Sequence, residues 1–263
     1  MKKIIFFDID GTLFVEGEYY IPESAIEAIH KAQANGHLCF INTGRPISTI
    51  EQCIWDIGFD GFVCGCGTYI HYNNEMIFKA ELDENIRKEI IQLSMDTHVE
   101  NVLEGIDGDY FPENMQYPFF LHVYDRYKQQ NFPVHLYNRD SIFNFEKMAC
   151  YIGEEADKER FLNYFLEDKD YDIIDRGDNN YEIIPLACTK ATGIDVLLDY
   201  LGLSIEDTIS IGDSSNDLSM LSHTKESVAM GNGSPMLFDK VTYVTTSINE
   251  DGIYNALKHF NLI

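Results

Sequence analysis

A short apolar segment at Ile4–Phe7, ending at an aspartate, constrains the fold more than any other feature of the chain. Four apolar residues without polar alternation are typical of a strand that is buried on both faces of a parallel sheet. A helix is predicted over Pro22–Asn35, because apolar residues recur there at helical spacing and Gly36 can end it. The alternation continues with a strand at His37–Ile41, a helix at Pro46–Trp55 and a strand at Phe62–Cys64. Short strands separated by helices indicate βαβ units.

The same alternation returns in the last third of the chain. Helices are predicted at Ala191–Leu201, Asn216–Leu221 and Gly252–Phe260, and strands at Thr208–Ile211, Ser227–Met230 and Val241–Val244. Together with the first eighty residues, these elements predict an α/β domain with a doubly wound parallel sheet, made of residues 1–82 and 185–263.

The middle of the chain, residues 83–184, has a different pattern. Helices are predicted at Glu84–Val99 and Glu155–Leu166, a strand at Met148–Ile152, and a hairpin of Tyr171–Asp175 with Tyr181–Ile184. Between the first helix and the first strand, the aromatic-rich stretch Tyr110–Tyr127 is expected to be irregular. Helices and antiparallel strands in about one hundred residues indicate an inserted α+β domain. The short junctions near Ala80–Asp83 and Pro185–Thr189 are expected to act as hinges.

The charge of the chain limits its partners. With 44 acidic and 19 basic residues, its formal net charge is −25, so nucleic acids and anionic membranes are not expected to bind. No segment reaches the ~18–20 apolar residues that span a bilayer, and the first apolar run is too short for a signal peptide. The six cysteines are scattered through apparent core segments, which favours a cytoplasmic location. Cys64 and Cys66 lack a second pair at zinc spacing and are expected to be structural.

The segment Asp8-Ile9-Asp10-Gly11-Thr12 directly follows the first predicted strand. Ligands of open α/β sheets bind beyond the carboxyl ends of the strands, so this loop is well placed. Two carboxylates separated by one residue can converge on a hard cation. One carboxylate can attack phosphorus while the other protonates the leaving alkoxide and activates water. An acidic turn at a strand end, without catalytic function, is the alternative interpretation.

A second acidic loop, Gly212-Asp213-Ser214-Ser215-Asn216-Asp217, also follows a predicted strand. It can complete a metal site with the first loop, and Asp213 is the expected direct ligand. Asn216 and Asp217 are expected to orient the site at the start of a short helix. A simple helix cap is the equally open alternative.

Two smaller features point to a phosphoryl group. Thr43-Gly44-Arg45 follows the second strand, where a hydroxyl and backbone amides can hold phosphate oxygens near the helix predicted from Pro46. Lys190 lies where the α/β pattern resumes, and its charge can neutralise Asp8 and the transferring phosphoryl group. Both patterns are frequent in proteins without such a function.

The order of these four features resembles the motifs of the haloacid dehalogenase-like hydrolase superfamily, in its Cof-type subfamily. The matching positions are Asp8–Thr12, Thr43, Lys190 and Gly212–Asp217, and Met230–Gly233 and Asn249–Ile253 are also similar to Cof-type segments. The resemblance covers nearly the whole core domain and implies that the insert is a C2-type cap that contributes substrate contacts. One departure is Cys64-Gly65-Cys66-Gly67, where many relatives have Asn-Gly, so a polar contact from that loop is in doubt.

The resemblance also implies a role for each matching residue. Asp8 would be the nucleophile and a Mg²⁺ ligand, and Asp10 the general acid/base that lends the metal its backbone carbonyl. Asp213 would bind Mg²⁺ with support from Asp217. Thr43 and the Gly44 amide would hold the phosphoryl group, Lys190 would stabilise it, and Asn216 would support the site with Asp217. Independently of the resemblance, Arg45 and Asn216 are expected among the substrate-binding residues, since Arg45 can offset the acidic surface near an anionic substrate.

The function expected from these features is Mg²⁺-dependent hydrolysis of phosphate monoesters of small metabolites, most often sugar phosphates. One alternative is a phosphosugar mutase, which would isomerise its substrate instead of releasing phosphate. Another is a non-catalytic, receiver-like module. In such a module Asp10, Lys190 and the insert would have no common function. Aromatic residues of the insert can stack on a substrate or form the insert's own core, and the core is favoured. The oligomeric state is left open, with a monomer as the default.

Overall fold

The computed structural model describes residues 2–15, 20–168 and 170–263. By its contacts the chain divides into two compact units, and each is described by itself. The first unit comprises Met1–Gly44, Glu51–Phe78 and Thr189–Ile263, and the second comprises Arg45–Ile50 and Lys79–Cys188. The expected insert was residues 83–184. The second unit instead begins at Lys79, ends at Cys188 and also includes the segment Arg45–Ile50. The assignment of the units as a core domain and an inserted domain remains a prediction.

An eight-stranded sheet forms the centre of the first unit, in the order β14-β13-β12-β1-β2-β3-β4-β5. Its strands are β1 (Ile4–Phe7), β2 (Leu38–Asn42), β3 (Gly61–Cys64), β4 (Tyr69–Tyr72), β5 (Glu75–Lys79), β12 (Thr208–Gly212), β13 (Glu226–Ala229) and β14 (Tyr243–Val244). The strands from β14 to β3 pair in parallel, and the chain winds outward from β1 in both directions. The predicted doubly wound sheet is therefore confirmed.

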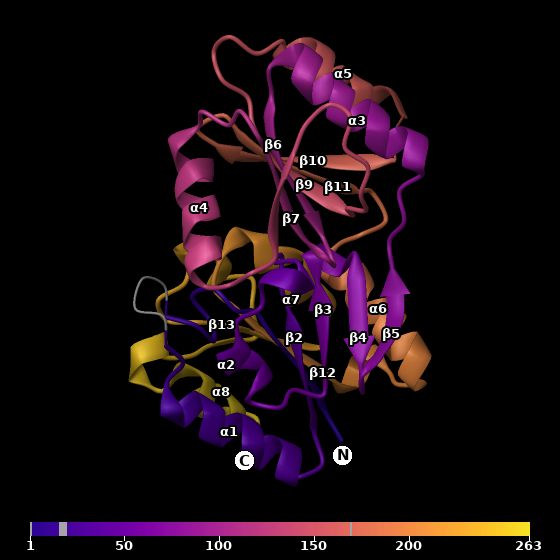
Figure 1. Ribbon diagram of the computed structural model, residues 1–263. Coiled ribbons are helices and arrows are strands. Elements are labelled where there is room, and N and C mark those ends of the chain that lie inside the picture. The colour runs from indigo at the N-terminus through magenta and orange to yellow at the C-terminus, as the bar shows by residue number, and fades with distance from the viewer. Residues whose placement is uncertain (1, 16–19, 169) are drawn as a thin grey trace. The chain divides into compact units, whose positions relative to one another are not determined.

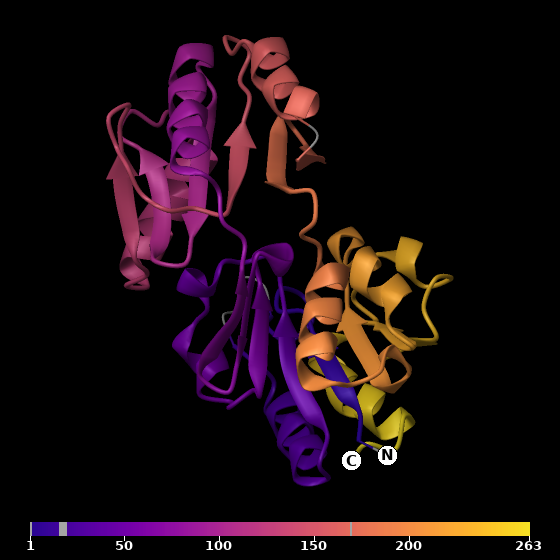
Figure 2. The same cartoon turned by 90° about the vertical axis from the view of Figure 1, so that its right-hand side faces the viewer.

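Helices cover this sheet, because its strands are apolar on both faces. The helices of the unit are α1 (Glu23–Ala34), α2 (Gln52–Trp55), α6 (Lys190–Leu201), α7 (Leu218–His223) and α8 (Gly252–His259). Buried side chains of α6 and α7 pack with Ile4 and Phe6 of β1, while α1 and α8 lie side by side (Figure 1). Both chain ends lie at the same end of the unit (Figures 1 and 2). The carboxyl ends of β1 and β12, where the acidic loops begin, lie at the other end.

One predicted helix was wrong. The helix predicted at Pro46–Trp55 is broken into a 3₁₀ turn at Ile47–Thr49 and the single turn α2, because Ile50 and Glu51 are extended. Several β-branched residues, which lose side-chain freedom in a helix, weaken helix formation there. No α-helix therefore begins at Pro46 to face a phosphate.

The strands β4 and β5 were not predicted. They form an edge of the sheet, with β4 antiparallel to β3. Asn73 and Asn74 both have positive φ and form the tight turn between them. This turn sequence was the signal that could have revealed the hairpin.

The second unit is built on a six-stranded sheet in the order β10-β11-β9-β6-β7-β8. Its strands are β6 (Glu100–Gly105), β7 (Gly108–Pro112), β8 (Val134–Tyr137), β9 (Lys147–Tyr151), β10 (Tyr171–Gly177) and β11 (Asn180–Pro185), and its helices are α3 (Glu84–Thr97), α4 (Pro118–Gln129) and α5 (Lys158–Asp168). All strand pairs are antiparallel except β7 with β8. The α+β class predicted for this part of the chain is confirmed.

The two faces of this sheet are covered differently. Apolar residues of α3 and α5, such as Ile90 and Phe161, pack with Leu103 and Met148 on one face. On the other face, α4 covers only the part that contains Val102 and Phe111. The stretch Tyr110–Tyr127, which was expected to be irregular, therefore contains part of β7 and most of α4, so that expectation was wrong.

Candidate functional site

The candidate site lies where β1, β2 and β12 of the first unit end. Asp8 follows β1 directly, and its amide donates to the carbonyl of Ile211 in β12 at 3.0 Å. The parallel register, which pairs Phe7 with both Ile41 and Ile211, places all three strand ends level with one another. This shared edge brings the sequence-distant loops to one place.

Lys190 joins the two acidic loops. It occupies the first position of α6, and Thr189 caps this helix by accepting from the Thr192 amide in a capping box. Its Nζ lies 2.5 Å from Asp8 Oδ1 and 2.6 Å from Asp217 Oδ1. Lys190 is 1% exposed and Asp217 is fully buried, so these ion pairs are shielded from water.

Asp217 orients the second loop. Besides Lys190, it accepts hydrogen bonds through Oδ2 from the amides of Asp213 at 2.9 Å and Ser214 at 3.0 Å. A Cβ on Gly212 would lie 2.6 Å from the Asp217 carboxyl carbon, so only glycine fits there. These bonds engage both oxygens of Asp217 and hold the loop that carries Asp213.

Asp213 is held against the first loop. Thr12 donates its hydroxyl to Asp213 Oδ1 at 3.1 Å. Gly11 has φ of 80°, and a Cβ there would meet Asp213 Oδ2 at 2.5 Å, so glycine is required for this approach. Asn232 donates to the carbonyl of Gly11 at 2.8 Å and thereby fixes the same turn.

Carboxylate oxygens of Asp8, Asp213 and Asp217 lie within 4.8 Å of one another. Among the described residues, Lys190 is the cation that pairs with Asp8 and Asp217, so the three carboxylates outnumber it in a largely buried site. Burial and the nearby Asp217 raise the pKa of Asp8 to about 8, against the lowering effect of Lys190. Burial lowers the pKa of Lys190, but Asp217 and Asp8 outweigh it and raise that pKa above its usual value. A divalent cation with a preference for oxygen ligands fits both the donors and the charge.

Thr43 and Gly44 follow β2 at the same edge. Thr43 is 1% exposed; its amide donates to the carbonyl of Val63, and its own carbonyl accepts from the Cys66 amide. Cys66 has a positive φ and lies close to Gly44, where a Cβ would be 3.4 Å from Cys66 Sγ. The cysteine-glycine loop therefore supports the Thr43 loop through its backbone.

The other predicted residues lie as follows. Asp10 is partly buried in the turn, where its backbone forms a bridge with Phe14. Asn216 is exposed and accepts from the Ser214 hydroxyl at 2.6 Å. Arg45, although next to Gly44 in sequence, belongs to the second unit by its contacts. Their catalytic or binding roles remain predictions.

Sequence reasoning assigned no role to several residues that hold this site in place. Asn42 is fully buried and donates its amide to the carbonyl of Lys190 at 2.9 Å. Thr12 and Asn232 tie the two acidic loops together, as described above. The Thr189–Thr192 pair had a recognisable helix-start pattern, whereas nothing in the sequence marks Asn42.

The chain was compared with known proteins. Residues 5–257 match the family model described as haloacid dehalogenase-like hydrolase. The chain is 28% identical over 270 residues to the Bacillus subtilis (strain 168) protein named "Putative phosphatase YkrA", covering 100% of this chain and 99% of that protein. It is 28% identical to the solved sugar phosphatase BT4131 of subclass IIB, with a TM-score of 0.81 and full coverage of both chains.

A second solved structure, of a hypothetical protein from Geobacillus kaustophilus HTA426, has a TM-score of 0.84 at 24% identity, with full coverage of both chains, and shows the shared fold. No helix among the described residues is long and apolar enough to cross a bilayer. The resemblance that the four motifs predicted is confirmed by a family match over almost the whole chain. The chain belongs to the haloacid dehalogenase-like hydrolases.

Proposed function

We propose that this enzyme is a Mg²⁺-dependent phosphatase that hydrolyses phosphate monoesters of small metabolites, sugar phosphates in particular. The observation that carries the proposal is the group formed by the buried Asp8, Lys190 and Asp217 and the partly buried Asp213 at the end of β1. The sugar phosphatase activity named for BT4131 also supports it. A cytoplasmic location is proposed with it, because the cysteines of the described chain are free thiols.

Asp8 would act as the nucleophile. Lys190 binds its Oδ1 and so directs Oδ2 as the attacking oxygen. Attack on phosphorus forms an aspartyl-phosphate and breaks the bond from phosphorus to the ester oxygen. Asp10 would give its proton to the departing alkoxide and take a proton from the water that next attacks phosphorus. The bond to Asp8 then breaks and inorganic phosphate leaves.

The remaining residues would position the phosphoryl group and the metal. Asp8 and Asp213 would hold Mg²⁺ with their carboxylates, and Asp10 with its backbone carbonyl, while Asp217 stays engaged with Lys190. When bound, Mg²⁺ would neutralise the carboxylates and the phosphoryl oxygens, which otherwise repel each other. Thr43 and the Gly44 amide would hold the phosphoryl oxygens.

Removing divalent metal is expected to stop turnover reversibly. With para-nitrophenyl phosphate as substrate, a chelator should lower the rate at least ~100-fold, and excess Mg²⁺ should restore it. The physical reason is the surplus of carboxylates around Asp8, which Lys190 alone does not balance. A full rate in chelator would contradict the metal's role.

Replacing Asp10 by asparagine is expected to separate formation of the aspartyl-phosphate from its hydrolysis. Loss of a general acid/base lowers kcat by about 10²–10⁴-fold. Para-nitrophenolate leaves without a proton, so labelled phosphate should still reach Asp8, and rapid-quench measurements should detect an accumulating phosphoenzyme. Equal activity of Asp10→Asn and the wild type on an alkyl phosphate would rule out the assigned role.

A further inference from the structure

Asn42 is a fully buried polar residue at the last position of β2. The parallel register pairs Ile41 with Phe7, so Asn42 lies beside Asp8 at the end of the neighbouring strand. Lys190 donates its Nζ to Asp8 Oδ1 at 2.5 Å, and Asn42 donates its Nδ2 to the Lys190 carbonyl at 2.9 Å. Two adjacent strand ends therefore hold the same lysine, one through its ammonium group and the other through its backbone.

Stability does not explain an asparagine at this position. Its Oδ1 is buried and has no hydrogen-bond partner among the residues that the structure describes. A buried polar atom without a partner costs free energy, and a leucine of similar volume would avoid that cost. Phe40, two residues earlier on the same face of β2, packs in the apolar cluster that contains Leu197 of α6. Asn42 therefore interrupts an apolar face, and its bond to Lys190 is what a leucine would lack.

The start of α6 is also held by the loop that follows β3. Gly67 in this loop has φ of 90°, and a Cβ there would lie 2.4 Å from the Thr189 carbonyl oxygen, so the two backbones touch. The same loop is tied to the residue after Asn42, because the Cys66 amide donates to the Thr43 carbonyl at 3.0 Å. The first turn of α6 is thus fixed against the chain segment that carries Thr43.

The place where α6 begins decides what Lys190 can reach. Lys190 is the first residue of the helix, and its Nζ lies 2.5 Å from Asp8 Oδ1 and 2.6 Å from Asp217 Oδ1. A shift of the first turn moves the Lys190 backbone and changes both distances. Because a displacement of about 1 Å at a reacting group can cost on the order of 100-fold in rate, a bond that fixes this turn also affects the reaction.

We infer that Asn42 is a positioning residue for the proposed phosphatase reaction. By holding the Lys190 carbonyl, it fixes the first turn of α6 relative to β1 and β2, so that the Lys190 ammonium group meets Asp8 and the phosphoryl group in one geometry. Its effect on the rate rests on the proposed function, whereas its effect on the first turn of α6 does not.

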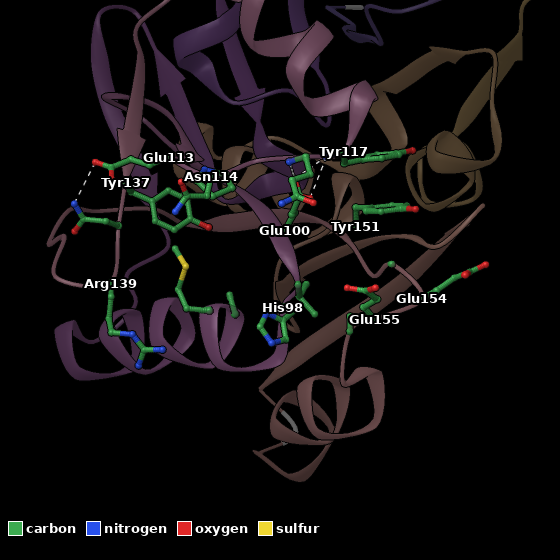
Figure 3. A pocket seen from close by; sticks show the side chains of 18 of the residues that line it. His98, Glu100, Glu113, Asn114, Tyr117, Tyr137, Arg139, Tyr151, Glu154 and Glu155 are labelled. Carbon is green, nitrogen blue, oxygen red and sulfur yellow. Dashed lines mark hydrogen bonds between the residues drawn. The ribbon is translucent and has the colours of Figure 1, made fainter.

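The second unit contains a matched asparagine. Asn101 of β6 is also fully buried, its Oδ1 likewise lacks a partner within the described part of the chain, and it donates to Ser94 Oγ of α3. Ser94 lines a cavity of about 860 Å³, in whose wall Glu100 accepts from the Tyr117 amide at 3.0 Å (Figure 3). All of these residues belong to the second unit, so Asn101→Leu makes the same chemical change without altering the first turn of α6.

The test replaces each asparagine by leucine in the full chain. In Asn42→Leu, kcat for para-nitrophenyl phosphate with saturating Mg²⁺ is expected to fall at least ~10-fold while KM stays within about threefold, because Lys190 is displaced rather than lost. The melting temperature should be unchanged or higher, since the unpaired Oδ1 is removed. Asn101→Leu is the control and should leave kcat unchanged. If Asn42→Leu does not fold, Asn42→Ala, which also lacks the donor, decides.

A double-mutant cycle separates positioning from general disruption. In the Lys190→Met chain, adding Asn42→Leu should lower kcat by less than about twofold, because no ammonium group is left to misplace. An unchanged kcat in Asn42→Leu, or a full further loss in the double variant, would overturn the inference.

Amide hydrogen exchange gives a readout that does not need turnover. Peptides that cover residues 190–194 are expected to exchange at least ~10-fold faster in Asn42→Leu than in the wild type, and no faster in Asn101→Leu. Equal exchange in Asn42→Leu and the wild type would contradict the inference. If the wild type released no phosphate, the proposed function would fail, and the exchange experiment would still decide whether Asn42 fixes the first turn of α6.

Discussion

Replacing Asp8 by asparagine is expected to abolish turnover. Loss of a catalytic nucleophile lowers kcat on the order of 10⁴-fold or more. An amide at this position cannot form the aspartyl-phosphate and carries no charge for a metal. Phosphate release from para-nitrophenyl phosphate, measured in the presence of Mg²⁺, is the direct test.

The same variant should keep its fold, which makes the result interpretable. Asparagine has nearly the shape of aspartate, and the substitution removes one of three carboxylates whose oxygens lie within 4.8 Å of one another. Without metal, the melting temperature of Asp8→Asn is therefore expected to equal or exceed that of the wild type. Mg²⁺ should stabilise the wild type more than the variant. Undiminished activity of Asp8→Asn would refute the nucleophile assignment.

The core of the fold could be predicted from the sequence because its strands are short, apolar and separated by helices. Ile4–Phe7 is both the predicted strand and the observed β1. The acidic loops at Asp8 and Asp213 could be placed together because parallel strands end at a common edge. Sequence position alone does not bring Lys190 to Asp8; that depends on the cap of α6 and on Asn42.

The predictions failed where long-range contacts decide the local structure. The segment after Pro46 was expected to be a helix, but Ser48 donates to the carbonyl of Gly105 at 2.9 Å and the chain becomes extended after Thr49. The aromatic stretch concealed β7 and α4, because its rings pack in several directions. Phe111 and Phe120 are buried there, and Tyr110 stacks on Phe143 at 3.7 Å, so these rings mainly form the core of the unit.

Charged side chains on one face of the second unit's sheet show a second limit of sequence reasoning. Glu104, Asp109, Lys147 and Glu182 come from four strands, and no spacing in the chain relates them. Only the register of the sheet brings them onto one face. The chain has a formal net charge of −25, but these four side chains and Arg176, which pairs with Glu182, carry positive and negative charges that nearly cancel.

Replacing Lys190 by methionine is expected to damage both stability and catalysis. Lys190 is fully shielded between Asp8 and Asp217, so its loss leaves buried carboxylates without a cation. Removing one partner of a buried ion pair typically lowers the free energy of unfolding by about 3–5 kcal/mol. Activity should fall by about 10²–10³-fold, because the charge on the phosphoryl group loses a fixed donor. Urea unfolding without metal measures the first effect, and phosphate release from para-nitrophenyl phosphate the second.

A second substitution separates these two effects. In Lys190→Met combined with Asp217→Asn, one negative charge is removed along with the positive one, so the urea midpoint should rise above that of Lys190→Met alone. Activity should stay low, since neither change restores a cation beside Asp8. Lys225→Met, which breaks an exposed pair with Glu206, is the surface control and should leave both quantities unchanged. If the double variant recovered activity together with stability, Lys190 would be a structural counter-ion rather than a catalytic residue.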